Sequence, residues 1–535
     1  MKTFYIKTFY KKITSKINYK NSKKILKSYN KLKETKNSNL IPEIIDQLSN
    51  TKFLIPQYKF KKFILGEAID YAEIALRQFF IATYLSKNLN KKLLLSLSGN
   101  NKIFFYPLPL SYLKIIRTYN IKVSFPISRL LFFLSIFKTL LNTILFKIFT
   151  FVKLFKNFEK SHIEHIQFMD LSISNLSIND KEGGIINWYI NYYKSKVEVT
   201  QIYHNVNNVP DNRINKISIS YNGFNDFGLN IYTSCCFFFW MINATLISLF
   251  DLLRGRWWHA FLLKQSVMSK KFSYLTKDQI AKKYLFSNSS WLVRPLWTYE
   301  ATKLGSEIIL YFYSTNNESV IDRTEKAIIG LGYSTMNWPK YLVWDIYQSN
   351  FIKNVAHKYA NIEIVGPIDF ISSPKHINII KCKSIAVFDV SPGNNLESAI
   401  LGAQGEYYTY KNVFNFLIDI YEIANKFDIK IRFKIKRSLT NRIDKRYIKL
   451  LSKLEKYDNI EFINPIISAN KIIESCSMTI SFPFTSTSII AKELNLPTVY
   501  YDSTGRLQKD DPGAHGVMLL SNKIELENWV LNNLI

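Results

Sequence analysis

The sequence predicts an α/β protein with two Rossmann-like domains that face a cleft, and with amphipathic helical insertions in its N-terminal half. Short apolar runs alternate with helix-length amphipathic segments, most regularly after residue 305. The N-terminal half repeats this alternation less regularly. The length of 535 residues fits two large domains or three smaller ones.

The C-terminal half contains seven predicted strands and three predicted helices. The strands are Glu307–Tyr313, Ile362–Val365, Ser384–Val390, Ile429–Lys434, Ile460–Ile463, Met478–Phe482 and Thr498–Tyr501. The helices are Tyr410–Phe427, Asn441–Leu454 and Ser486–Leu494. Strands separated by helix-length segments indicate a parallel sheet, which binds ligands at the carboxyl ends of its strands.

The N-terminal half contains five predicted strands, with helical segments between them. The strands are Lys61–Leu65, Lys92–Leu97, Lys122–Phe125, His165–Met169 and Val197–Tyr203, and the helices are Ala68–Ser86, Pro109–Tyr119 and Ile185–Tyr193. We expect a basic arm over residues 1–45, a first Rossmann-like domain with apolar helices over 46–300 and a second Rossmann-like domain over 301–535.

The chain carries 71 Lys and Arg against 41 Asp and Glu, a formal charge of +30. Only 13 of these cations are Arg, a bias typical of an AT-rich genome rather than of selection for a polyanion. The first forty residues hold twelve Lys and one acid, Glu34. This arm suits an anionic membrane surface or RNA, and it is equally typical of a solvated tail.

Four cysteines without a CxxC pair argue against a disulfide scaffold and a zinc knuckle. The first forty residues also lack the uncharged apolar core of a secretory signal. The sequence therefore predicts a cytoplasmic protein that is peripheral on the inner membrane.

Two apolar stretches, Leu130–Phe151 and Tyr232–Leu253, are candidates for that membrane contact. Leu130–Phe151 contains two lysines, which makes it a poor membrane span. Tyr232–Leu253 has no charge up to Phe250, but a span here would put the two domains on opposite sides of the bilayer. We favour interfacial helices, and buried core helices are the alternative.

Hydroxyl residues follow the predicted strand Met478–Phe482, at Thr485, Ser486, Thr487 and Ser488. A helix that starts directly after a strand presents backbone N–H groups and a positive dipole end, which together bind phosphate. One hydroxyl would serve as a helix cap, whereas four in succession exceed what a cap requires. The sequence therefore predicts that Thr485, Ser486 and Thr487 bind a phosphate group.

A second basic motif, Lys436-Arg437, follows the predicted strand Ile429–Lys434 and would face the same cleft. Arg binds carboxylates and phosphates through two parallel hydrogen bonds. Arg437 and Arg294 are therefore candidate donor-binding residues, although a surface ion pair is the commoner role of an Arg.

Carboxylates follow four apolar runs, at Asp170, Asp345, Asp389 and Asp502. A carboxylate at a strand end can bind a ribose hydroxyl, act as a base or cap the next helix. We predict that Asp389 and Asp502 bind the donor, that Asp345 caps a helix, and that Asp170 is the catalytic base or nucleophile.

The sequence lacks the motifs that are typical of nucleotide-cofactor, ATP-dependent and metal-dependent enzymes. The sequence has no GxGxxG, P-loop or DxD motif, and the pair His162 and His165 has no third ligand nearby in the sequence. We therefore expect no metal and no cofactor. His515, in a Gly-rich turn, is expected to face the cleft or to be exposed.

Several motifs occur together in one order and resemble a family of bacterial surface carbohydrate biosynthesis proteins. They are Gly255-Arg256-Trp257-Trp258, Arg294–Glu300, Trp338-Pro339, Tyr341–Asp345, Val365–Ile368, Ile385–Asp389, Lys434–Arg437 and Pro483–Thr487. These proteins are similar to GT-B glycosyltransferases that use CMP-linked Kdo or sialic acid. The resemblance covers residues 250–520 well. Asp369 departs from it, because an aromatic residue is expected after Gly-Pro-Ile, and Glu493 does not match the usual donor-helix glutamate.

The resemblance implies a glycosyltransferase that moves a sugar from a nucleotide donor, with a CMP-linked sugar as one candidate, to a polysaccharide or lipopolysaccharide acceptor. It implies that residues 46–300 form the acceptor domain and residues 301–535 the nucleotide-sugar donor domain, in which Thr485, Ser486, Thr487, Lys436 and Arg437 hold the donor. The partners would be a nucleotide sugar, a glycolipid or polysaccharide acceptor and the inner leaflet, without nucleic acid. A non-catalytic GT-B-shaped scaffold and a polyanion-binding protein remain the alternatives.

Overall fold

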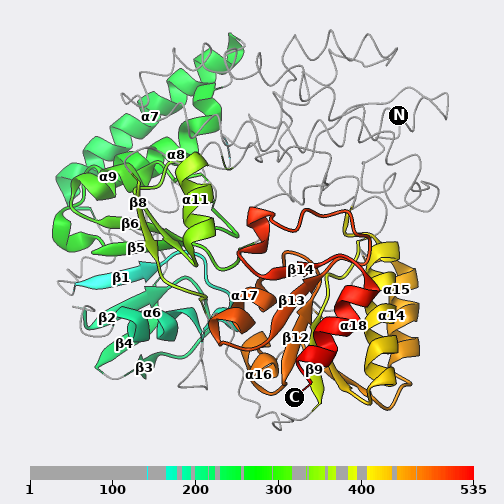
Figure 1. The fold of residues 1–535 in the computed structure, drawn as a ribbon. Helices are drawn as coiled ribbons and strands as arrows, with labels where there is room; N and C mark the ends of the chain where they lie inside the picture. Colours follow the sequence, from blue (N-terminus) through cyan, green and yellow to red (C-terminus); the bar gives the residue numbers. More distant parts are fainter. Residues whose placement is uncertain are drawn as a thin grey trace, which may run out of the picture.

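The computed structural model describes two β-sheets, each with helices packed around it (Figure 1). The described residues are 141, 164–176, 184–193, 199–214, 216–222, 229–254, 258–291, 293–315, 333, 336–355, 360–368, 383–393, 407–435, 443–465 and 467–534. The predicted arm over residues 1–45, the three strands before residue 130 and the helices between them lie outside these ranges. The stretch Leu130–Phe151 does too, apart from the helical residue Leu141.

The first sheet has eight strands in the order β3-β4-β2-β1-β5-β6-β7-β8. All neighbours pair in parallel except β3 and β4. The strands are β1 (His165–Phe168), β2 (Gln201–His204), β3 (Asn212–Ile214), β4 (Ile217–Tyr221), β5 (Lys283–Ser287), β6 (Glu307–Tyr311), β7 (Lys340–Val343) and β8 (Asn361–Ile364).

The second sheet has six parallel strands in the order β11-β10-β9-β12-β13-β14. They are β9 (Ser384–Phe388), β10 (Lys430–Lys434), β11 (Ile460–Ile463), β12 (Met478–Ser481), β13 (Thr498–Tyr501) and β14 (Met518–Leu520). In chain order, β9 to β11 extend to one side of the sheet and β12 to β14 to the other. This is the strand order of a dinucleotide-binding Rossmann domain.

Helices connect the strands of both sheets. The first sheet carries α6 (Ile185–Tyr193), α7 (Ile231–Leu253), α8 (Trp258–Phe272), α9 (Trp297–Lys303), α11 (Ile346–Val355) and the short helices η1 (Ile173–Asn175) and η3 (Lys277–Gln279). The second carries α14 (Tyr410–Lys426), α15 (Lys445–Leu454), α16 (Ala469–Glu474), α17 (Ser486–Glu493), α18 (Lys523–Asn532) and η4 (Pro512–Ala514). Side chains cap several of these helices, as the Thr409 hydroxyl does by accepting the N–H of Asn412 at the start of α14.

The apolar cores form around strands that are covered on both faces of their sheet. Every residue of β9 is buried, as are four of five in β6, which explains their uninterrupted apolar sequences. Aromatic side chains join the helices to the first sheet. Trp297 of α9 packs with Phe272 of α8 and Tyr284 of β5, at ring-centroid distances of 4.6 and 4.9 Å.

The α/β fold class is confirmed, but the predicted domain boundary near residue 300 is wrong. The strands β6, β7 and β8 pair with the first sheet, so the chain passes to the second sheet between Ile364 and Ser384. Sequence periodicity could not locate this change, because parallel strands of neighbouring sheets have the same apolar pattern. The runs at β3, β4, β5, β7 and β14 were not predicted as strands.

Candidate active site

The strand order places a topological switch point in each sheet. In the first sheet the chain starts at β1, moves outward through β2 and β4, and returns to the other side of β1 with β5. In the second sheet, β9 and β12 are related in the same way. Ligands of such sheets bind at the carboxyl ends of the two strands that flank this point. The residues after β1, β5, β9 and β12 are therefore the candidates for chemistry.

Asp170 lies at the switch point of the first sheet, two residues after β1. Its two carboxylate oxygens each accept the backbone N–H of Ser287, at 3.1 Å. Burial raises the pKa of the Asp170 carboxyl to about 7, although the N–H of Ser287 and the hydroxyl of Ser290 act in the opposite direction. A carboxyl with this pKa exchanges its proton near neutral pH, which suits a general base.

The residues after β5 surround Asp170 with hydroxyl and amide groups. The Ser287 and Ser289 hydroxyls lie 2.9 Å apart, and the Asn288 side-chain oxygen accepts the N–H of Tyr313, which follows β6. Tyr311, at the end of β6, is fully buried, and burial together with the negative charge of Asp170 raises the pKa of its phenol far above its usual range. A polar row therefore crosses the carboxyl ends of β1, β5 and β6.

The start of α17 lies at the switch point of the second sheet. Thr485 occupies the N-cap position, but its hydroxyl donates to the Phe482 carbonyl at 2.9 Å and does not cap the helix. The Thr487 hydroxyl is 2.8 Å from that of Ser481. The Tyr500 hydroxyl donates to the Thr485 carbonyl at 2.5 Å. The side chains thus fix the loop, while the first-turn N–H groups have no partner within the helix.

The two sheets meet along α17. At its start, the Ser486 hydroxyl accepts the N–H of Thr315, which follows β6, at 3.3 Å. Toward its end, the Lys492 ammonium donates to the His515 carbonyl at 3.0 Å. Figure 1 shows α17 on the side of the second sheet that faces the first. The carboxyl ends of the first sheet therefore face the helix that begins at the second switch point.

A contact between a histidine and a carboxylate completes this junction. The Nδ1 atom of His515 is 2.6 Å from Oδ2 of Asp345, which follows β7. The other oxygen of Asp345 accepts the N–H of Gln348, so the prediction that Asp345 caps a helix is confirmed for α11. His515 is buried and adopts a positive φ. A Cβ on the adjacent Gly516 would lie 2.7 Å from the Tyr347 hydroxyl, which explains the glycine at this close approach.

Asp389 and Asp502 are held by contacts within the protein. The Tyr447 hydroxyl donates to Asp389 at 2.6 Å. Asp502 is fully buried and accepts hydrogen bonds from the Tyr407 hydroxyl, the Leu507 N–H and both the N–H and the hydroxyl of Thr504. Asp502 thus shapes the loop after β13. The contact of either residue with a donor stays a prediction.

Arg294 is also engaged within the protein. Its guanidinium donates to the Thr298 hydroxyl at 2.9 Å and the Thr302 hydroxyl at 2.7 Å, and it stacks 3.9 Å from the Tyr299 ring. Burial lowers the pKa of Arg294 to about 10. These contacts hold the segment before α9 against the helix itself, and a donor contact of Arg294 stays a prediction.

The basic motif after β10 is described only in part. Lys436 and Arg437 lie outside the described residues. Lys434, at the end of β10, donates to the Pro465 carbonyl at 3.0 Å, and burial lowers the pKa of its ammonium to about 8. Within the described ranges, no group of three or more His, Cys, Asp or Glu side chains could hold a metal ion.

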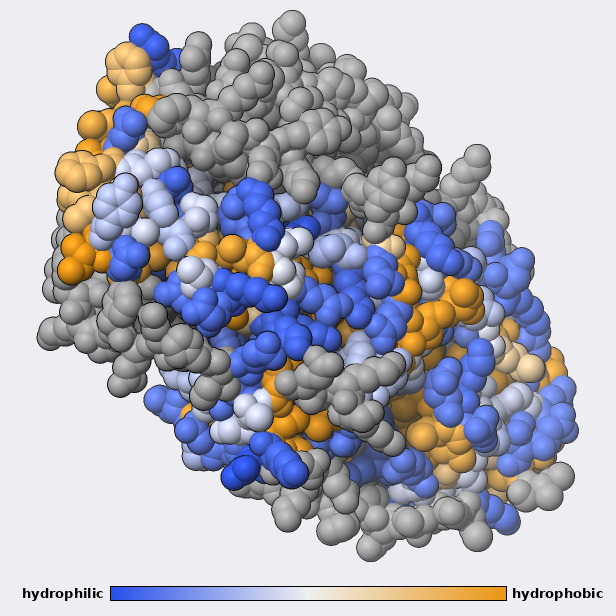
Figure 2. Space-filling view, turned by 90° about the vertical axis from the view of Figure 1, so that its left-hand side faces the viewer, coloured by the Kyte–Doolittle hydropathy of each residue, from blue (hydrophilic) through white to orange (hydrophobic). Residues whose placement is uncertain are grey.

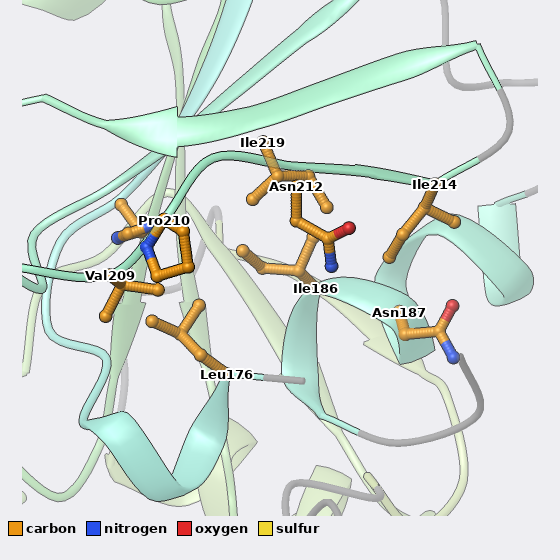
Figure 3. Close-up of a pocket in the computed structure, with 9 residues that line it drawn as sticks. Leu176, Ile186, Asn187, Val209, Pro210, Asn212, Ile214 and Ile219 are labelled. Atoms are coloured by element: carbon orange, nitrogen blue, oxygen red, sulfur yellow. The ribbon is translucent and has the colours of Figure 1, made fainter. Parts of the chain in front are cut away.

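A small cavity lies elsewhere in the first domain, between α6 and the strands β2 to β4 (Figure 3). Its volume is about 20 Å³, and its lining includes Ile186, Val209 and the buried His204. Burial lowers the pKa of His204. A cavity of this size holds about one water molecule, so it is not a sugar site.

Two doubly wound sheets with polar switch points define a two-domain α/β protein of the kind that binds a ligand at strand ends. The chain belongs to the family of polysaccharide biosynthesis PFTS motif proteins, whose model matches residues 240–530. The match begins within α7 and includes the end of β6 and the start of α17. The comparison with curated proteins gives no match.

Several solved structures match this chain at low sequence identity. The wall teichoic acid polymerase TagF is 12% identical, with a TM-score of 0.37, and the match covers 74% of this chain and 87% of TagF. The UDP-GlcNAc 2-epimerase from Methanocaldococcus jannaschii is 13% identical, with a TM-score of 0.36, and covers 69% of this chain and 92% of its own. Matches with TM-scores this low do not indicate a function for this chain.

Sequence reasoning singled out Asp345 and His515 separately but missed their pairing, because they are 170 residues apart. It also missed the serines that contact Asp170. A local signal for them exists: the apolar run Tyr284-Leu285-Phe286 breaks abruptly into Ser287-Asn288-Ser289-Ser290.

Proposed function

We propose that the chain is a glycosyltransferase of polysaccharide biosynthesis that moves a sugar from a nucleotide donor to a polysaccharide or glycolipid acceptor. The family supports the pathway. The observation that supports the enzymatic role is that the two switch points face each other. One offers a half-buried carboxyl with a pKa of about 7, and the other offers a helix start.

The second sheet would hold the donor. Its switch point offers the N–H groups at the start of α17, beside the hydroxyls of Ser486 and Thr487. A helix start favours phosphate through its N–H groups and the positive end of its dipole. Lys436 and Arg437 would add positive charge to the same phosphate or to a sugar carboxylate. A CMP-linked sugar, which carries one phosphate, is our leading donor.

The first sheet would supply the proton acceptor. Asp170 is two strands away from β6, about 10 Å at the usual strand spacing. The residues after β6 contact the start of α17 through Thr315 and Ser486. A sugar linked to a phosphate at that helix start would therefore extend toward the carboxyl ends of β5 and β1, where Asp170 lies.

The proposed step is a displacement at the anomeric carbon. Asp170 takes the proton of an acceptor hydroxyl, and the hydroxyl oxygen forms a bond to the anomeric carbon. The bond from that carbon to the phosphate oxygen breaks, and the nucleotide leaves with the electron pair. Backbone N–H groups stabilise the charge that develops on the phosphate, so the step needs no metal or cofactor. One displacement inverts the anomeric configuration, whereas Asp170 acting as a nucleophile would retain it.

The donor site is tested by thermal unfolding of the full chain with CMP, UDP, GDP and ADP. We expect one nucleotide to raise the melting temperature by roughly 5 °C at a concentration a hundredfold above its Kd. Ser486→Asp places a negative charge at the start of α17. It stabilises the helix dipole but repels phosphate, so the shift should disappear while the free protein stays folded.

Ala469→Asp is the matched control, because it adds the same charge at the start of α16, which follows β11 three strands from β12. It should keep the nucleotide shift. If no nucleotide stabilises the folded protein, the donor site is absent and the chain is a scaffold. If Ser486→Asp and Ala469→Asp bind nucleotide equally, the site lies away from α17.

A further inference from the structure

The helix α7 has one face that is packed and one that is not. Ser234, Phe237, Met241, Ala244 and Ser248 are buried, at spacings of three and four residues. This face packs against α8, and Phe237 meets Tyr274 edge to face at 6.4 Å. The helix is therefore anchored to the first domain along its whole length.

The opposite face of α7 is apolar and exposed. We define the α7 stripe as the exposed residues Ile231, Tyr232, Phe239, Ile242, Leu246, Phe250 and Leu253. Tyr232, Phe239 and Leu253 are 77%, 70% and 79% exposed. Figure 2 shows hydrophobic surface in the upper left, where this helix projects from the molecule. Contiguous exposed apolar surface of this kind marks an interaction site.

No residue from Ile231 to Phe250 carries a charge. A helix of a soluble protein that faces water normally has polar and charged residues on that face. Here the flanks of the α7 stripe are also apolar, with the partly buried Phe238, Trp240, Ile247 and Leu249. The apolar face is thus wider than the narrow seam of a coiled coil, and it lacks the charged flanks that pair two such helices.

Positive charge borders the α7 stripe. Arg254, exposed at the end of α7, stacks 3.9 Å from the ring of Phe250. A broad apolar face with aromatic residues and an exposed Arg254 at its end complements the acyl chains and anionic headgroups of a lipid surface.

We propose that α7 lies in the plane of an anionic lipid bilayer, with the α7 stripe inserted among the headgroups. Among the described residues, α7 is the one helix long and apolar enough to cross a membrane. It does not cross, because its other face is occupied by α8 and the core of the first domain. At 23 residues it offers a contact about 34 Å long. This proposal is independent of the transferase activity.

The test is flotation of the full chain with vesicles of phosphatidylethanolamine and phosphatidylglycerol, at low and at high salt. High salt screens attraction between lipid and exposed lysines, so the binding that persists reports apolar insertion. We expect Phe239→Asp combined with Leu246→Asp to lower the high-salt partition coefficient at least tenfold. Arg254→Gln should lower low-salt binding to these vesicles about fivefold and leave binding to phosphatidylcholine vesicles unchanged.

Ile524→Asp on α18 is the matched control, because Ile524 is 73% exposed and lies in the second domain. It should bind vesicles like the unmodified chain. The proposal is overturned if the unmodified, folded chain does not float at high salt, or if the double variant floats equally well. It is also overturned if sedimentation in the absence of lipid shows a dimer that the double variant dissociates, because the α7 stripe would then be covered by a second copy.

Discussion

The two sheets use carboxylates at their strand ends in opposite ways. In the first sheet, Asp170 is half-buried with few hydrogen-bond donors, so its charged form is costly and its pKa rises to about 7. In the second sheet, Asp502 is more deeply buried but accepts four hydrogen bonds from the protein. Burial alone therefore does not decide what a carboxylate does. The number of donors around it separates a group that can exchange a proton from one that holds a loop.

The sharpest way to test this comparison is Asp170→Asn. If Asp170 is the base, sugar transfer should fall about a thousandfold, which is within the range for loss of a general base. Nucleotide binding should be unchanged, because the donor site lies in the other sheet. Asp458→Asn, an exposed carboxylate of the second domain, is the control and should keep full activity. Equal activity of both variants would remove Asp170 from the mechanism.

The second test addresses Asp502. Asp502→Ala leaves the donors of Tyr407, Thr504 and Leu507 without their acceptor, so we expect the free energy of unfolding to fall by about 3 kcal/mol. Urea denaturation measures it, and Asp510→Ala, at an exposed carboxylate of the same loop, should change it by less than about 0.5 kcal/mol. A stable Asp502→Ala variant that loses nucleotide binding would instead make Asp502 a donor ligand.

The third test uses pH. The folded protein keeps a proton on Asp170 up to about pH 7, whereas the unfolded chain releases it near 3.8. Stability should therefore fall as pH rises through this interval and then level off. Between pH 5 and 7 the loss should be about 2–3 kcal/mol. Asp170→Asn should remove this component, so parallel pH curves for the two proteins would contradict the raised pKa.

The smallest expected effect concerns the contact between the sheets. A double-mutant cycle with Asp345→Asn and His515→Ala should give a coupling energy of about 1–2 kcal/mol in unfolding. Asn at position 345 still accepts the N–H of Gln348, so the cap of α11 is kept. A coupling energy near zero would mean that the contact does not hold the two sheets together.

Much of the fold was predictable because local periodicity determines it. The predicted strands Ile460–Ile463 and Thr498–Tyr501 match β11 and β13, and the helix Ile185–Tyr193 matches α6. Sheet membership was not predictable, since strand pairing depends on contacts distant in sequence. This is why β6 to β8 were assigned to the wrong domain.

The candidate site was predictable only as separate residues. Hydroxyls at Thr485 to Thr487 and a carboxylate at Asp170 are local signals after apolar strands. Whether such a residue faces a ligand or a protein donor depends on its neighbours in space. Asp389 and Asp502 show this, because Tyr447 and Tyr407, which donate to them, come from other elements.

The two ends of helix α17 contact different parts of the molecule. It starts at the proposed donor site, and its far end carries Lys492, which holds the His515 carbonyl next to Asp345 of the other sheet. Eight residues of helix make a stiff rod about 12 Å long. A nucleotide bound at the proposed donor site would therefore contact the same short helix that holds His515, and through His515 the Asp345 of the other sheet.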